Sequence, residues 1–129
     1  MNNKIIEVKG LTKRFNSFKA IDNISFSVNK GEVFAFLGPN GAGKTTTIKI
    51  LTTLLKPTKG FIRLDGFDVL KEPEKVRSSF GIVFQDQSLD DELTAYENMY
   101  FHTILYKIPK SMRKEKIESM LKLVGLYDK

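Results

Sequence analysis

The chain has 129 residues, of which 41% are hydrophobic, enough for one small domain with a buried core. It contains no cysteine, which excludes disulfides and zinc–thiolate sites and is typical of a reducing compartment. The net charge is +6, but residues 107–129 carry +4 of it, interleaved with apolar residues at helical spacing. That pattern is typical of a solvated helix face, so we expect no nucleic-acid partner.

Strands are predicted first along the chain. Ile24, Phe26 and Val28 alternate with polar residues, which predicts a half-buried strand. After a turn at residues 30–31, residues 33–37 form an unbroken apolar run, typical of a strand buried on both faces of a parallel sheet. Together they predict a small antiparallel layer that leads into an α/β core.

A glycine-rich loop follows this run. Residues 38–45, Gly-Pro-Asn-Gly-Ala-Gly-Lys-Thr, match the phosphate-loop pattern GxxxxGK[ST], and apolar residues recur after them at helical spacing, namely Ile48, Leu51, Leu54 and Leu55. Glycines let backbone N–H groups at a helix N-terminus approach a triphosphate. In such loops the lysine, here Lys44, reaches the β and γ phosphates, and the hydroxyl of Thr45 ligates Mg²⁺. The predicted nucleotide contacts are Gly38, Asn40, Gly41, Ala42, Gly43, Lys44, Thr45 and Thr46.

The helix that begins at the loop is expected to stop near Lys56, because Pro57 and the residues after it cannot continue it. Residues 61–66 then predict a hairpin at the edge of the sheet, with a tight Asp-Gly turn. A short helix over residues 74–79 and a second apolar strand over residues 81–84 complete the mixed α/β region.

Helical periodicity dominates the rest of the chain. Thr94 and Glu97 form a capping-box pattern that opens a helix reaching to about Lys107. Ser111 is expected to cap a second helix, which Gly125 ends.

These motifs together resemble the nucleotide-binding domain of an ABC transporter. The resemblance is carried by the phosphate loop, residues 25–32 before it, the turn and strand at 57–62, and the strand followed by glutamine at 83–85. The tract 89–98 is similar to the branch that includes daunorubicin-type drug exporters and other ABC-2 export ATPases. The resemblance covers this whole chain but only the first half of the family domain.

The resemblance implies a truncated α/β fold of the P-loop NTPase (ABC-type ATPase) class. Residues 1–86 would form the antiparallel β layer and the phosphate-loop core, and residues 87–129 the beginning of a helical subdomain.

The same resemblance assigns roles to two residues outside the loop. Phe15 stands where the family has a tyrosine that stacks on adenine, and Phe18 is the rival for this role. Gln85 corresponds to the glutamine that senses Mg²⁺ and the γ-phosphate, so the metal contacts are Thr45 and Gln85. The implied cofactors are ATP and Mg²⁺.

The implied function is the ATP-binding subunit of an exporter at the cytoplasmic face of the cell membrane. Its partners would be an ABC-2 type permease and a second nucleotide-binding subunit. The family's Leu-Ser-Gly-Gly-Gln signature, its catalytic Glu and its later His are absent, so we expect no catalytic residue here and no hydrolysis by this chain alone. Asp86, the acidic run 90–92 and His102 are not expected to replace them. The alternatives are a naturally truncated, non-catalytic ATP-binding module and, less favoured, another phosphate-loop enzyme such as a small kinase or GTPase.

Overall fold

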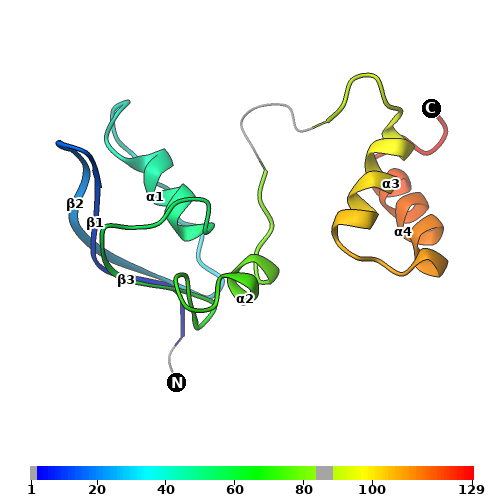
Figure 1. Cartoon of the computed structure of the whole chain (residues 1–129). Helices are drawn as coiled ribbons and strands as arrows, with labels where there is room; N and C mark the ends of the chain where they lie inside the picture. The colour runs from blue at the N-terminus through cyan, green and yellow to red at the C-terminus, as the bar shows by residue number, and fades with distance from the viewer. Residues whose placement is uncertain (1–2, 84–88) are drawn as a thin grey trace. The chain divides into compact units, whose positions relative to one another are not determined.

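The computed structural model describes residues 3–83 and 89–129, which form two compact units, Met1–Ile82 and Val83–Lys129. The first unit holds all the strands described, with helices α1 and α2, and the second holds helices α3 and α4 (Figure 1). Among these residues no helix is both long enough and apolar enough to cross a membrane.

A four-stranded antiparallel sheet, in the order β2-β1-β3-β4, is the frame of the first unit. Strands β1 (Lys4–Phe15) and β2 (Phe18–Asn29) form a long hairpin. Strand β3 (Lys59–Leu64) pairs with the other side of β1, and the short β4 (Phe67–Asp68) closes the edge. The expected antiparallel layer, with its alternating strand and its edge hairpin, is confirmed.

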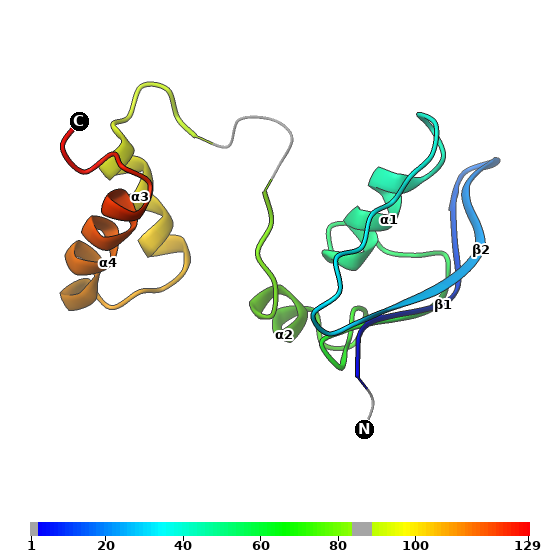
Figure 2. The same cartoon turned by 180° about the vertical axis from the view of Figure 1, so that it is seen from behind.

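Helix α1 (Lys44–Leu51) covers one face of this sheet (Figures 1 and 2). Its Ile50 is fully buried against Leu11 of β1 and Ile62 of β3, which are 0% and 2% exposed. The contact face contains Ile50 rather than Ile48, which is 42% exposed. Burial of such side chains, at about 25 cal/mol per Å², holds the helix on the sheet.

The prediction of a buried parallel strand over residues 33–37 is wrong. These residues form no strand, and the side chains of Val33 and Leu37 are 102% and 92% exposed. A parallel strand needs hydrogen-bonded neighbours, and no described strand is hydrogen-bonded to this segment. Instead, Phe34 stacks on Phe26 of β2 with ring centroids 5.5 Å apart, and Phe36 packs edge-on against both rings.

The second predicted apolar strand, at residues 81–84, is also not seen in the part that the structure describes. Residues 81–83 have no strand pairing, and the side chain of Val83 is 98% exposed. Neither segment has a described strand hydrogen-bonded to it, which explains both failures.

Helix α1 is shorter than predicted, because it ends at Leu51 and not near Lys56. The hydroxyl of Thr52 donates to the carbonyl of Ile48 at 2.8 Å, and Thr53 takes the left-handed conformation with φ 64°. Threonine hydroxyls compete for helix carbonyls, and a left-handed residue is a common helix end. The residues before Pro57 therefore end the helix. The short helix after Pro73 is confirmed as α2 (Pro73–Ser78).

Helices α3 (Ala95–Leu105) and α4 (Lys110–Leu123) pack on each other in the second unit. The capping box is confirmed: the N–H of Glu97 donates to the Thr94 hydroxyl, and the N–H of Thr94 donates to the Glu97 carboxylate. The pKa of Glu97 is held below its ordinary value of 4.5 by two hydrogen bonds to its carboxylate, from the backbone N–H and from the hydroxyl of Thr94.

Helix α4 ends as predicted, but it does not begin as predicted. Ser111 lies inside the helix, and Pro109 is the residue before it, without a side-chain cap. A proline fixes its own φ near the helical value, which suits it to a helix start. Gly125, with φ 71°, ends α4, and the N–H of Leu126 then reaches the carbonyl of Leu121 at 2.9 Å.

Candidate nucleotide-binding site

The phosphate loop of the sequence lies directly before helix α1, at the same end of the first unit as the tip of the β1–β2 hairpin (Figure 2). Gly41 and Gly43 have φ 84° and 87°, a left-handed conformation that other residues adopt only at a cost. Gly43 is the residue at the helix start and has no side chain to cap it. The first N–H groups of α1 are thus left for an external anion.

Lys44 is held by the loop itself. Its ammonium donates to the carbonyl oxygen of Pro39 at 2.8 Å and also to that of Gly38. The positive charge therefore lies within the loop, beside the helix N-terminus. Next to it, the buried Thr47 hydroxyl donates to the carbonyl of Gly43 at 2.8 Å, which fixes the first turn of α1.

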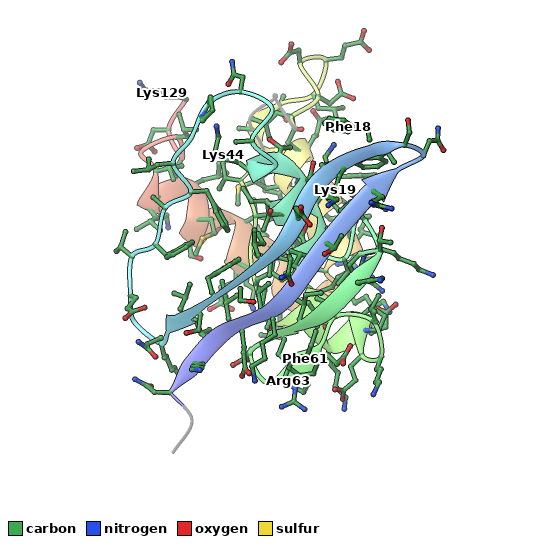
Figure 3. All side chains as sticks on the ribbon, turned by 90° about the vertical axis from the view of Figure 1, so that its left-hand side faces the viewer. Phe18, Lys19, Lys44, Phe61, Arg63 and Lys129 are labelled. Carbon is green, nitrogen blue, oxygen red and sulfur yellow. The ribbon has the colours of Figure 1, made fainter. Side chains whose placement is uncertain are left out.

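A cavity of about 240 Å³ joins the loop to the hairpin. It is lined by Phe15, Phe18 and Ala20 of the hairpin and by Asn40, Gly41, Ala42, Gly43, Lys44, Thr45 and Thr46. Every predicted loop contact except Gly38 lines it, and the carbonyl oxygen of Gly38 accepts from the ammonium of Lys44, which does line it. Figure 3 shows Phe18 near the hairpin tip and Lys44 at the start of α1. Gln85 and Asp86 lie outside the described residues.

Ala20 is the lining residue that the sequence did not reveal. A Cβ added to Gly43 would stand 2.7 Å from the carbonyl oxygen of Ala20 and 3.2 Å from Ile21 Cγ1. The absence of a side chain at Gly43 thus lets β2 approach the loop closely. The only sequence signal for this contact is the small size of both residues.

A sequence profile of the ABC transporter family matches residues 21–129 of this chain. The chain belongs to the ABC transporter family. Relatives named as ATP-binding proteins, and a matching solved structure of the ATP-binding subunit of an ABC transporter, place the chain among the ATP-binding members of this family.

Two curated relatives illustrate the range of the family. The daunorubicin/doxorubicin resistance ATP-binding protein DrrA of Streptomyces peucetius is 38% identical over 125 residues, which are 97% of this chain and 38% of DrrA. The methionine import ATP-binding protein MetN of Corynebacterium glutamicum is 37% identical over 133 residues, covering 96% of this chain and 37% of MetN. The resemblance to daunorubicin-type ATPases is therefore confirmed.

The fold is confirmed by solved structures. The structure of cbiO1 from Clostridium perfringens, part of the ABC transporter complex cbiONQ, matches with a TM-score of 0.80 and 30% identity. The match covers 97% of this chain and 52% of cbiO1. This chain spans about half the length of cbiO1 and less than half the length of the curated relatives.

The donors around the cavity fit a Mg²⁺–triphosphate. One ammonium, an uncapped helix N-terminus and backbone freed by glycines supply positive potential, which suits phosphate oxygens. Thr45 and Thr46 supply hydroxyl oxygens of the kind that Mg²⁺ accepts. None of the described lining residues is a carboxylate.

The other polar candidates have ordinary structural partners. Asp90 accepts from the N–H of Glu92 through its carboxylate, and its backbone exchanges hydrogen bonds with the side-chain amide of Asn98. The ring of His102 lies 6.3 Å from that of Tyr106. Within residues 3–83 and 89–129 there is no group of three or more His, Asp or Glu side chains placed to hold a metal.

Proposed function

We propose that this chain binds ATP·Mg²⁺ in the cavity between the phosphate loop and the β1–β2 hairpin. The observation that carries the proposal is that the loop and two hairpin phenylalanines line one cavity, with the Lys44 ammonium beside it. The phosphates would lie against the N-terminus of α1, and the base would lie against an aromatic ring. Phe15 is proposed to stack on adenine, with Phe18 as its neighbour.

Mg²⁺ would be held by the Thr45 hydroxyl and the side chain of Gln85. When bound, the ion neutralises charge on the phosphate oxygens. Gly38, Asn40, Gly41, Ala42, Gly43 and Thr46 would contribute to the phosphate cradle. The lining of the cavity and the glycine conformations support the loop residues from Asn40 to Thr46, whereas Gln85 is assigned from the family resemblance alone.

The test is calorimetric titration of ATP·Mg²⁺ into the unsubstituted chain and into Lys44→Ala. Loss of one charge-assisted contact, worth roughly 1.5–3 kcal/mol, should weaken binding at least about tenfold. Lys49→Ala is the matched control, because it removes an exposed lysine from the same helix outside the cavity. Equal affinities in equally folded Lys44→Ala and unsubstituted protein would refute the assignment.

We further propose that the full protein couples ATP hydrolysis to export through an ABC-2 type permease, as one of two nucleotide-binding subunits at the cytoplasmic face of the membrane. The names of DrrA and MetN point to drug resistance and to import, respectively. The exporter proposal is supported by the sequence of residues 89–98. Tyr96 and Phe101 of α3, 40% and 56% exposed, offer surface for such a partner.

Residues 1–86 are proposed as the β layer and phosphate-loop core, and residues 87–129 as the beginning of the helical subdomain. The division of the described structure near residue 82 supports this boundary. By itself the chain is proposed to bind ATP without hydrolysing it, because no described side chain beside the cavity can serve as a general base for water.

A further inference from the structure

The ring of Phe15 is covered by a cation on one side. The ammonium of Lys13 lies over this ring, 4.8 Å from its centroid. Lys13 and Phe15 are two positions apart on β1, where the pairing with β2 shifts register between Lys13 and Arg14. A lysine so placed is attracted to the negative face of the ring.

The ammonium of Lys13 is also held by a hydrogen bond. Its ammonium donates to the carbonyl oxygen of Lys56 at 2.8 Å, in the segment that follows α1. The same segment is tied to β1 by two further hydrogen bonds, from Thr58 N–H to the carbonyl of Thr12 and from Arg14 N–H to the Thr58 hydroxyl, both 2.9 Å long. The cation over the ring thus has an anchored position.

Of these two side chains, only the ring belongs to the cavity wall. Phe15 lines the cavity, whereas Lys13 does not. Lys44 is the only lysine among the described residues that line the cavity, so the Lys13 ammonium meets the Phe15 ring outside the cavity lining. Phe18 differs from Phe15 in this respect, since no lysine or arginine of the described residues lies over its ring, which belongs to a 63% exposed side chain.

We propose that Lys13 is a positioning residue for the nucleobase: it holds the Phe15 ring from behind, so that a purine stacks on the face toward the cavity. This inference rests on the proposed ATP site. It adds a structural reason why the base would stack on Phe15 and not on Phe18. A ring held in one orientation loses less conformational freedom when a base stacks on it. An exposed cation–π contact of this size can change the affinity for a stacked base by at most roughly two- to fivefold.

The first readout needs no nucleotide. The chain contains no tryptophan, so Phe15→Trp places a single fluorescent reporter at the site. Adding Lys13→Met should lower the fluorescence anisotropy of this tryptophan, because the ring is released. The control is Lys19→Met, at an exposed lysine of the same hairpin (Figure 3). Lys19 pairs with Asp22 and lies over no ring of the described residues. An anisotropy that Lys13→Met leaves unchanged would overturn the inference.

The second readout separates base from phosphates. In otherwise unsubstituted protein, Lys13→Met should weaken ATP·Mg²⁺ roughly two- to fivefold and leave inorganic triphosphate unaffected, and Lys13→Arg should restore ATP binding. In a Phe15→Ala background Lys13→Met should have no further effect on ATP. Equal weakening of ATP and triphosphate would show a general charge effect and overturn the inference. If the unsubstituted chain bound neither compound, the proposed function and the nucleobase role would fall, while the anisotropy would still decide whether Lys13 holds the ring.

Discussion

Alanine substitution at Gly43 should destabilise the first unit more than the same substitution at Gly41. Both glycines have nearly the same left-handed φ, 87° and 84°. For an L-residue this conformation costs roughly 1–2 kcal/mol. The two positions differ in space, because an added Cβ at Gly41 meets nothing within 4 Å.

At Gly43 the added Cβ would lie 2.7 Å from the backbone carbonyl oxygen of Ala20, closer than the 3.0 Å below which something must shift. The oxygen belongs to β2, so relief requires a shift of the hairpin against α1. Overpacking of this kind costs about 1–3 kcal/mol, which adds to the conformational strain for a total of about 2–5 kcal/mol. For a unit of this size each kcal/mol corresponds to a Tm change of about 4–8 °C.

The assay is thermal unfolding followed by circular dichroism, with ATP·Mg²⁺ titrations on the same proteins. Gly31→Ala is the matched control, since Gly31 has φ 85°, no atom within 4 Å of an added Cβ, and a position outside the cavity. Gly41→Ala and Gly31→Ala should lower the Tm alike, but only Gly41→Ala should weaken ATP. A Tm for Gly43→Ala equal to that of Gly41→Ala would refute the close approach of β2 to the loop.

Three further predictions follow from the site and from α3. Phe15→Ala should weaken the affinity for ATP by roughly 1 kcal/mol or more, about fivefold, without changing the affinity for inorganic triphosphate. Phe15→Trp should preserve the affinity for ATP. A larger loss of ATP affinity in Phe18→Ala would assign the stacking to Phe18. Phosphate release from ATP by the purified chain should not exceed that of Lys44→Ala, and turnover above this control would reveal a catalytic carboxylate. The third concerns pH: because the bonds from Thr94 lower the pKa of Glu97 in the folded state, they stabilise α3 above pH 4.5 and this stabilisation is lost as the pH falls through the folded pKa. In acid titrations by circular dichroism, Glu97→Gln should therefore unfold more readily than the unsubstituted chain above pH 4.5, and the difference should vanish in stronger acid; a constant difference would contradict the role of the charge.

The parts of the structure that short-range interactions determine were predictable from the sequence. The capping box of Thr94 and Glu97 needs only two side chains three residues apart, and the end of α4 needs only the freedom of Gly125 to adopt positive φ. The Asp65-Gly66 turn likewise requires no distant partner. The phosphate loop is of the same kind, because its glycines and Lys44 act within a few residues of one another.

Strand β1 was not predicted, although half of the sheet pairs with it. Its pairing with β2 shifts register between Val8 and Leu11, around Gly10 with φ 59°. Such bulges break the alternation of apolar and polar residues by which a strand is recognised.

Only the tertiary structure decided which distant residues meet. The register of the hairpin brings Phe15, Phe18 and Ala20 to the phosphate loop, and the folding of the chain brings the Lys13 ammonium to the carbonyl of Lys56. Conversely, a strand that the sequence predicted is not formed: residues 33–37 have the composition of a buried strand but are not in a strand in the described structure. The reason is the same in each case: a turn or a cap is completed by its own neighbours, whereas a strand or a binding cavity exists only when segments far apart in the chain supply the other half of each contact.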